Sequence, residues 1–397
     1  MARFFTRLLV LLGALCLGAC ATQVARVPVP AGLLHDELFA PPSVRTTAAD
    51  VMALSPAMHR YLSDEVRPLA RSMGFQHALV ELLYAKGKLR LDYDAVMTRT
   101  ASEAFEARAG NCLSLVIMTA ALAKELGMEV TFQTVPIEDA WERSGNLHLF
   151  VGHVNLVLGP RPLSQWQWSS SDRMTIDFMP NVRNRMAVPI SQERVLAMYM
   201  NNKAAESLAA DRLDDAYAWA RVAVQQDEQY MASFNTLGVV YQRRGALAEA
   251  ERALRHVLRV EHNNVHAMGN LVLVLQRQGR DAESVTLAAE LRRLQPVAPF
   301  EEFKAGLVAL QMRDFRRARQ LFERELARSA DYHEFHFWLA VTLANLGDTD
   351  GARSHLQQAL ENSTTREQGA LYAGKLQKLK AQAAQTTRAA EPVHRGL

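Results

Sequence analysis

Three side chains in the first half of the chain have the chemistry needed to attack a carbonyl group. Cys112 is followed along the chain by His153 and then by Asp177. A thiolate is the nucleophilic form of cysteine, an imidazole can accept and return its proton, and a carboxylate can orient the imidazole. This order predicts acyl transfer, with Cys112 as the nucleophile, His153 as the general acid and base, and Asp177 as the orienting group.

The surrounding sequence offers alternatives to these assignments. A lone cysteine in an apolar helix is usually a small core residue. His148 competes with His153, and the two would lie on opposite faces of a single strand because 153 − 148 = 5 is odd. Asp172 competes with Asp177, which could instead satisfy a loop amide. The backbone N–H of Cys112 is one candidate oxyanion donor, and the sequence does not identify the second.

The elements that must position these residues predict an α+β domain. Thr100 to Glu103 has the pattern of a capping box and opens a helix to about Arg108, which Gly110 is expected to end. The next helix, Cys112 to Leu126, is apolar on nearly all sides and should be buried. At its start, free N–H groups and the helix dipole favour the thiolate. Three β-like runs follow, at residues 130–135, 147–158 and 174–178. Helices followed by strands are typical of an α+β fold.

These motifs resemble the transglutaminase-like superfamily, which shares the papain-like cysteine-peptidase architecture. The resemblance covers roughly residues 95–180. It is carried by Thr100-Ala101-Ser102-Glu103-Ala104-Phe105, Gly110-Asn111-Cys112-Leu113-Ser114, Ala121-Leu122-Ala123-Lys124-Glu125-Leu126-Gly127, His153-Val154 and Asp177. It implies the same three roles for Cys112, His153 and Asp177. The superfamily includes transglutaminases, peptidases, deamidases and proteins without known activity, so the resemblance leaves the substrate open.

The composition excludes several classes of protein. Of the 397 residues, 49% are hydrophobic and 22% are charged, and the net charge is +3. This argues against disorder over most of the chain and against a nucleic-acid partner. Three cysteines exclude a disulfide framework and a zinc site built from cysteine alone. No Walker A loop or dinucleotide fingerprint is present, so neither a cofactor nor a metal is expected.

The first two cysteines, Cys16 and Cys20, fall in a predicted export signal. Arg3 and Arg7 precede an apolar run, Leu8 to Leu17, that is too short to span a bilayer. The following Leu-Gly-Ala-Cys resembles the lipobox of bacterial lipoproteins, in which Cys20 becomes the lipidated first residue. By the same analogy, the alanine after Cys20 favours sorting to the outer membrane. We therefore expect a chain that is lipid-anchored at the periplasmic face of the outer membrane.

The second half of the chain repeats with a period of 34 residues. With units starting at residues 197, 231, 265, 299 and 333, the twentieth position holds Ala216, Ala250, Ser284, Ala318 and Ala352. The fifteenth position, in the turn between paired helices, holds Asp211, Gly245, Gly279, Arg313 and Gly347. This pattern resembles the tetratricopeptide repeat, an all-α solenoid. The resemblance implies a concave groove that binds a protein or peptide partner and has no chemistry of its own.

The sequence thus predicts five segments. They are a lipoprotein signal peptide (1–19), the lipidated cysteine with a Pro-rich tether (20–42), a transglutaminase-like domain (43–190), five tetratricopeptide repeats (197–366), and a capping helix with a frayed tail (367–397). The expected function is that of an envelope-anchored peptidase or amidase whose repeats recruit its protein partner. The alternative is a non-catalytic repeat scaffold that carries a transglutaminase-like pseudoenzyme domain. The oligomeric state is left open.

Overall fold

The computed structural model describes residues 28–43, 47–84, 91–94, 97–135, 141–144, 147–150, 152–159, 173–178 and 186–390. The predicted signal sequence with Cys16 and Cys20, and also Asp172, lie outside these ranges. None of the helices in the described ranges combines the length and the apolar character needed to cross a bilayer.

The N-terminal region contains a small antiparallel sheet of four strands in the order β7-β6-β3-β8. The described strands are β1 (Asp92–Tyr93), β2 (Ala109–Gly110), β3 (Val130–Val135), β4 (Trp141–Ser144), β5 (Leu147–Phe150), β6 (His153–Leu158), β7 (Met174–Ile176) and β8 (Val188–Ile190). β1 pairs with β2, and β4 pairs with β5. The run predicted as one strand over residues 147–158 is therefore wrong: β5 and β6 belong to different sheets.

The helices before the sheet are short, except for one that is buried. They are η1 (Asp36–Leu38), α2 (Ala48–Val51), α3 (Pro56–Tyr61), η2 (Leu62–Val66), α4 (Arg67–Met73), α5 (Phe75–Tyr84), α6 (Ala101–Ala107) and α7 (Cys112–Glu125). The predicted capping box opens α6, with Thr100 and Glu103 bonded to each other's backbone N–H groups. Gly110 does not end this helix, because Arg108 already ends it in a left-handed conformation with φ 51°. α7 packs against β6 as the central helix.

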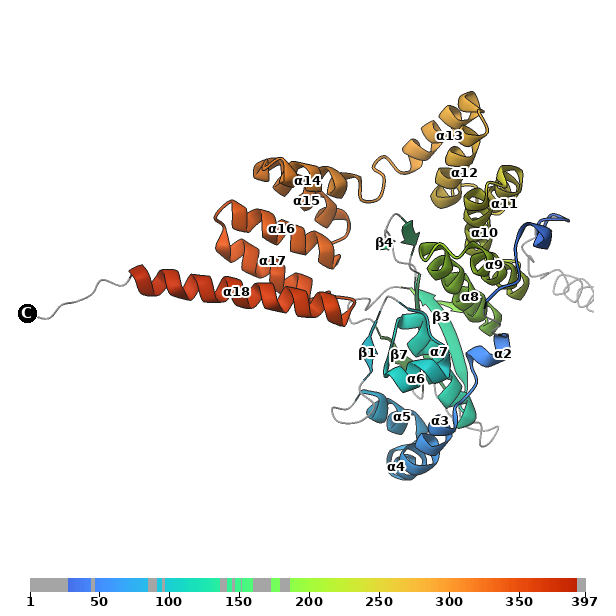
Figure 1. Ribbon diagram of the computed structural model, residues 1–397. Coiled ribbons are helices and arrows are strands. Elements are labelled where there is room, and N and C mark those ends of the chain that lie inside the picture. Colours follow the sequence, from blue (N-terminus) through green and yellow to red (C-terminus); the bar gives the residue numbers. More distant parts are fainter. Residues whose placement is uncertain are drawn as a thin grey trace, which may run out of the picture.

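Residues 192–390 are helical throughout and form antiparallel pairs followed by a long last helix (Figure 1). The helices are α8 (Gln192–Ala209), α9 (Leu213–Gln226), α10 (Met231–Arg244), α11 (Leu247–Val260), α12 (Val265–Arg277), α13 (Asp281–Leu294), α14 (Glu301–Gln311), α15 (Phe315–Arg328), α16 (His333–Asn345), α17 (Thr349–Glu361) and α18 (Arg366–Ala390). α18 packs on α17 as a cap. It extends to Ala390.

The 34-residue period sets the turns within the helix pairs. All five residues at the fifteenth position have a positive φ: Asp211 (57°), Gly245 (88°), Gly279 (74°), Arg313 (60°) and Gly347 (84°). The eighth position brings the paired helices together. A Cβ at Gly238 would lie 2.8 Å from Leu254 Cγ, so only glycine fits without a shift of the leucine.

The hydrophobic core is divided between two parts of the chain. One cluster runs without interruption from Leu33 through the central helix α7 and the first three helix pairs to Leu275. A second cluster begins at Phe300 and, with a small third cluster of Ala340, Leu356 and Leu376, holds the fourth and fifth pairs and α18. The N-terminal domain and the first three repeats therefore share one core.

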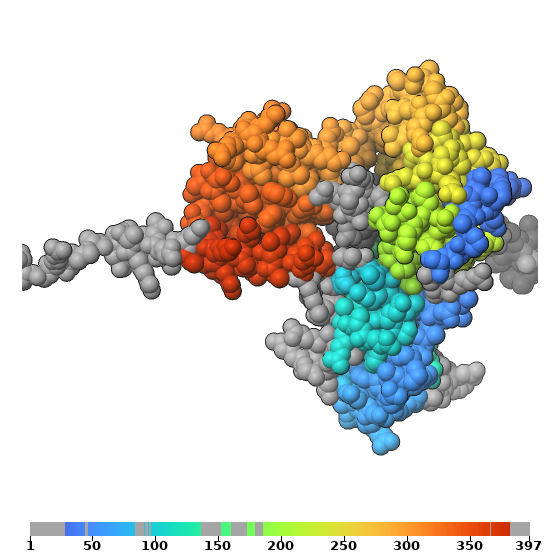
Figure 2. Space-filling view, viewed as in Figure 1, coloured from blue at the N-terminus to red at the C-terminus, as the bar shows by residue number. Residues whose placement is uncertain are grey.

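Residues 28–43, most of them in the predicted tether, are ordered against the first two repeats. The Phe39 ring stacks on Tyr217 with 4.0 Å between ring centroids and 1° between planes. The Tyr241 hydroxyl donates to the Leu33 carbonyl at 2.9 Å. This segment lies along the green and yellow repeats in Figure 2. The sequence did not predict this packing, because a Pro-rich segment has no periodic apolar face.

Candidate active site

Cys112 is the first residue of α7. The two residues before it, Gly110 and Asn111, set the start of this helix. The Asn111 side chain caps the helix by accepting a hydrogen bond from Ser114 N at 2.9 Å. A Cβ at Gly110 would lie 2.7 Å from Ser114 Cβ, so glycine permits the close approach of β2 to α7. The Cys112 side chain is 4% exposed and its thiol is free.

His153 and Asp177 come from neighbouring strands of the sheet. His153 begins β6, and Asp177 directly follows β7, which pairs with β6. His153 Nε2 lies 2.8 Å from Asp177 Oδ1 and 3.0 Å from its Oδ2. The imidazole is buried, at 1% exposed, whereas the carboxylate side chain is 27% exposed. The structure therefore brings together these two predicted residues, which are far apart in the sequence.

The second ring nitrogen of His153 is the one available to the thiol. His153 Nδ1 is buried and has no hydrogen-bond partner among the described residues. Burial alone would lower the pKa of His153, but the hydrogen bond to Asp177 and the proximity of the Cys112 thiol outweigh it and raise the pKa to about 9. The imidazole thus faces the carboxylate with one nitrogen and has the thiol within electrostatic reach. The contact between the thiol and Nδ1 need not already be a hydrogen bond, because catalytic hydrogen bonds are often long until substrate binds.

Asn155 is a residue of this site that sequence reasoning missed. Its Nδ2 donates to Asp177 Oδ2 at 3.1 Å, and its side chain is 5% exposed. Asn155 lies two residues after His153 on β6, so both side chains point to the same face of the sheet. This spacing could have placed Asn155 beside His153, but its role also depends on Asp177. Asn155 holds the carboxylate that orients His153.

The alternatives from the sequence have different outcomes. The argument that placed His148 opposite His153 assumed one continuous strand, and it fails because His148 belongs to β5. Asp172 lies outside the described residues. In the described ranges, no group of three or more histidine, cysteine, aspartate or glutamate side chains could hold a metal ion. The catalytic roles of Cys112, His153 and Asp177 stay predictions.

The raised pKa of His153 predicts a pH-dependent stability. A group whose pKa rises from 6.5 to about 9 on folding stabilises the protein fully below pH 6.5 and loses that contribution as pH rises through 9. We expect the free energy of unfolding of the wild type, relative to His153→Ala, to fall by on the order of 3 kcal/mol between pH 6 and pH 10. Urea titrations at both pH values measure this difference. An unchanged difference would contradict the raised pKa.

The loop before α6 connects this site to the first repeat. Thr98 is 2% exposed, and its Oγ1 accepts a hydrogen bond from Asn111 Nδ2 at 2.9 Å. Its N–H donates to Glu206 Oε1 on α8 at 2.6 Å, and Lys203 Nζ donates to its carbonyl at 3.3 Å. Lys203 and Glu206 hold the seventh and tenth positions of the first unit. In the second unit these positions hold apolar residues that pack between repeats. The N-terminal domain therefore takes the place of a preceding repeat.

We expect Glu206→Ala to destabilise the protein by about 1–3 kcal/mol, because it leaves the buried Thr98 N–H without an acceptor. Glu249→Ala on α11 is the matched control. The Glu206 and Glu249 side chains are 24% and 23% exposed, and each is ion-paired three residues along its helix, but Glu249 pairs only with Arg252. Urea unfolding compares the two variants. Equal losses would show that the contact with Thr98 contributes nothing.

Comparison with known families identifies the repeats. Residues 231–261 and residues 303–367 match models of the tetratricopeptide repeat. These ranges cover the second helix pair and most of the last two. The prediction of C-terminal tetratricopeptide repeats is therefore confirmed. Proteins of this class bind peptide or protein partners in the concave groove of the array. Comparison with curated proteins gives no match.

Several solved structures are similar to part of this chain, among them proteins described as having tetratricopeptide repeats. A thermophilic protein of Thermus thermophilus is 19% identical, covers 45% of this chain and 98% of its own, and has a TM-score of 0.27. PilF of Pseudomonas aeruginosa is 18% identical, covers 51% of this chain and 100% of its own, and has a TM-score of 0.27. YrrB, described as having an unusual peptide-binding site, is 19% identical, covers 45% of this chain and 92% of its own, and has a TM-score of 0.25.

Proposed function

We propose that this protein binds a protein or peptide partner through its repeats and carries a cysteine acyl-transfer centre of the transglutaminase-like type in its N-terminal domain. The observation that carries the catalytic part is the buried His153, which is bonded to Asp177 through Nε2 and has the Cys112 thiol near its ring. A buried ring nitrogen without a partner is costly, and an ion pair of the imidazolium with the Cys112 thiolate, formed when the thiol proton passes to the ring, accounts for it. The small antiparallel sheet behind a buried helix that starts at Cys112 supports a papain-like fold.

The proposed reaction is acyl transfer at a peptide or side-chain amide. The Cys112 thiol gives its proton to His153 Nδ1, and its sulfur forms a bond to the carbonyl carbon. The C–N bond then breaks, and the amine leaves with the proton from the imidazolium. Water then attacks the thioester carbonyl with His153 taking one of its protons, the C–S bond breaks, and the carboxylic acid leaves as the proton restores the Cys112 thiol. This outcome makes the enzyme a peptidase or amidase. An amine in place of water would give crosslinking.

The second candidate is a scaffold with an inert transglutaminase-like domain. Two observations favour it. Both family matches lie in the repeats, which bind partners without chemistry of their own. The Cys112 thiol is also buried, as structural cysteines are. In this reading the shared core simply fixes the repeats to the N-terminal domain.

Acylation by p-nitrophenyl acetate separates the two candidates without a known substrate. If the centre is active, the full chain releases a stoichiometric burst of p-nitrophenolate, and mass spectrometry finds an acetyl group on Cys112. The burst is lost in Cys112→Ala and strongly slowed in His153→Ala. A burst that is absent, or that does not depend on His153, favours the scaffold. For an active centre, added methylamine then reports whether the thioester goes to water or to an amine.

We also propose that Cys20 anchors the protein at the periplasmic face of the outer membrane. The support is the sequence of the predicted signal, which ends in a lipobox-like motif. Metabolic labelling with an alkyne fatty acid should label the wild type but not Cys20→Ala. Fractionation of the envelope should place the wild type with the outer membrane. A labelled Cys20→Ala variant would overturn the assignment.

A further inference from the structure

The repeat array is interrupted between its third and fourth units. Neighbouring units pack through α9 on α10, α11 on α12 and α15 on α16, whereas α13 and α14 hardly touch. Figure 1 shows α14 and α15 set apart from α12 and α13, with only the connecting chain between them. The core also divides at this place, because the first cluster ends at Leu275 and the next begins at Phe300. One side of α14 therefore lacks the neighbour that the equivalent helices have.

The exposed side of α14 is the face that the other units bury against their predecessor. At the tenth position, the second, third and fifth units have side chains that are 0% exposed: Val240, Val274 and Thr342. The fourth unit has Val308 there, which is 50% exposed. The same difference is found at the seventh position. Leu237, Leu271 and Leu339 of the second, third and fifth units are buried, whereas Ala305 of the fourth unit is exposed. α14 thus has an apolar stacking face that is uncovered.

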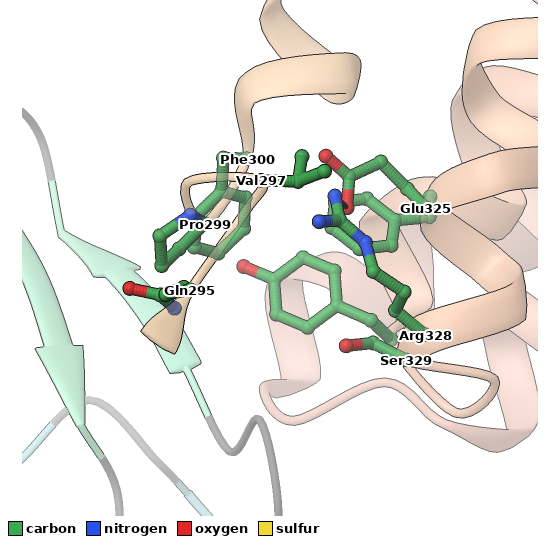
Figure 3. A pocket seen from close by; sticks show the side chains of 9 residues that line it. Gln295, Val297, Pro299, Phe300, Glu325, Arg328 and Ser329 are labelled. Atoms are coloured by element: carbon green, nitrogen blue, oxygen red, sulfur yellow. Dashed lines mark hydrogen bonds and ion pairs between the residues drawn. The ribbon is translucent and has the colours of Figure 1, made fainter. Parts of the chain in front are cut away.

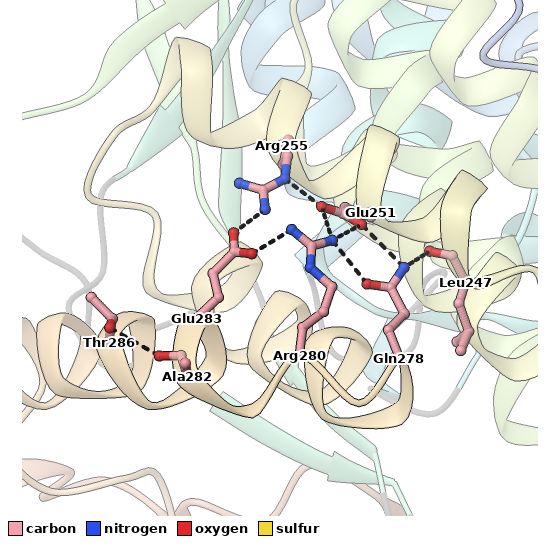
Figure 4. A network of polar contacts seen from close by, with 8 residues as sticks. All are labelled: Leu247, Glu251, Arg255, Gln278, Arg280, Ala282, Glu283 and Thr286. Carbon is pink, nitrogen blue, oxygen red and sulfur yellow. Dashed lines mark hydrogen bonds and ion pairs between the residues drawn. The ribbon is translucent and has the colours of Figure 1, made fainter.

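The intact junction between the second and third units shows which side chains would meet. Glu251, at position 21 of the second unit, accepts a hydrogen bond from Gln278 at position 14 of the third at 3.1 Å (Figure 4). Arg280 bonds the same carboxylate at 2.6 Å. At the open junction these two positions hold Val285 and Met312, which are 65% and 77% exposed. A polar pair is replaced by an apolar pair that is largely exposed.

The connection between the halves is two residues longer than the connections at the intact junctions. Six residues, 295–300, separate α13 from α14, whereas four separate α11 from α12 and α15 from α16. The second half of this linker is held to the fourth unit. Ala298 N donates to Glu301 at 3.1 Å, and Pro299 and Phe300 line a cavity of about 30 Å³ against Glu325 and Arg328 of α15 (Figure 3). Gln295 and Val297 line the same cavity, so the whole linker lies against the fourth unit, and the place where the halves can turn is its junction with the end of α13.

We propose that the exposed face of α14 is the docking surface for α13 of the same chain, and that this structure shows the open state of the junction. Docking brings Val285 to Met312 and covers Val308. A hollow of about 370 Å³ lies beside this face; Pro296, Ala305 and Leu321 line it together with the charged Glu301, Glu302, Arg317 and Arg324, and α13 would enter it from its apolar side. The short linker keeps α13 at high effective concentration, which favours it over another chain. The closed state joins both halves of the groove, and a partner that spans them shifts the population towards it.

Cross-linking of an introduced cysteine pair tests this proposal in the full chain. Val285→Cys with Met312→Cys is treated with a short bis-maleimide, and the linked peptides are identified by mass spectrometry. Glu251→Cys with Gln278→Cys, whose native side chains are in contact, is the positive reference. We expect the 285–312 link to form within single chains, as shown by mixing isotope-labelled and unlabelled protein. No link where the reference pair reacts, or a link only between different chains, would overturn the proposal.

A second substitution tests whether the link depends on the α14 face. Val308→Asp places a charge where docking would bury it, and we expect it to reduce the yield of the 285–312 link at least fivefold. Leu371→Asp on α18 is the matched control, because Val308 and Leu371 are 50% and 49% exposed. Both substitutions are at exposed positions, so both variants should fold. Equal yields in the two variants would overturn the assignment of this face.

Discussion

Replacement of Asp177 by Asn should slow the carbamidomethylation of Cys112 by iodoacetamide at pH 6.5 by at least about tenfold, which corresponds to 1.36 kcal/mol. Asp177 helps to raise the pKa of His153 to about 9. Without that negative charge the imidazolium is less stable, so it supports the thiolate less. The amide of the new asparagine would also point its NH₂ group either at Asn155 Nδ2, which is itself a donor, or at the His153 ring. The rate constant is measured by mass spectrometry of the Cys112 peptide.

Asp94→Asn is the control for this prediction. Both carboxylate side chains are 27% exposed and form an ion pair in the N-terminal domain, but Asp94 bonds Arg99 at 2.9 Å instead of the histidine. The Asp94 variant should alkylate at the wild-type rate. If both variants are slowed alike, the effect is a general loss of stability. If neither is slowed, Asp177 does not act on the thiol through His153.

Loss of a large core side chain should destabilise only the part of the chain that shares its core. Phe234 and Phe322 are both 0% exposed and belong to different clusters. Replacement of either by Ala should cost about 3–5 kcal/mol, because it removes a buried ring and leaves a cavity. Phe234→Ala should raise hydrogen exchange in α7 as well as in α10, since one core holds both. Phe322→Ala should raise it in α16 and leave α7 protected.

Hydrogen exchange followed by mass spectrometry measures this for each helix under native conditions. Each variant is the control for the other, because the same type of side chain is removed at the same exposure. Faster exchange of α7 in Phe322→Ala would mean that the two clusters unfold as one unit. Unchanged exchange of α7 in Phe234→Ala would mean that the N-terminal domain is stable without the repeats.

The elements with local signals were predicted closely. α7 begins at Cys112 as predicted and ends one residue before the expected Leu126, because its nearly continuous apolar character and the following glycine are both local. β3 has the predicted bounds. The 34-residue period located all five turns between paired helices, each of which has a residue with positive φ, including Asp211 and Arg313, which are not glycine. The boundaries of the predicted domains stay predictions.

The errors arose where a local pattern has two structural outcomes. Residues 147–158 are apolar with little interruption, so the sequence does not show that β5 ends at Phe150 and joins another sheet. Gly110 looks like a helix end, yet it serves the close approach of β2 to Ser114. Asn155 carries no signal by itself, because its role depends on a carboxylate 22 residues further along the chain.

The sequence by itself determined the order of elements, the repeat and the identity of the three candidate residues, because helical period, capping and turn chemistry act between near neighbours. The tertiary structure decided which partners meet. It placed Asp177 on His153, joined Thr98 to the first repeat, laid residues 28–43 along α9 and α10, and left α13 away from α14. These contacts link residues distant in the chain, and their free energy depends on how whole elements pack.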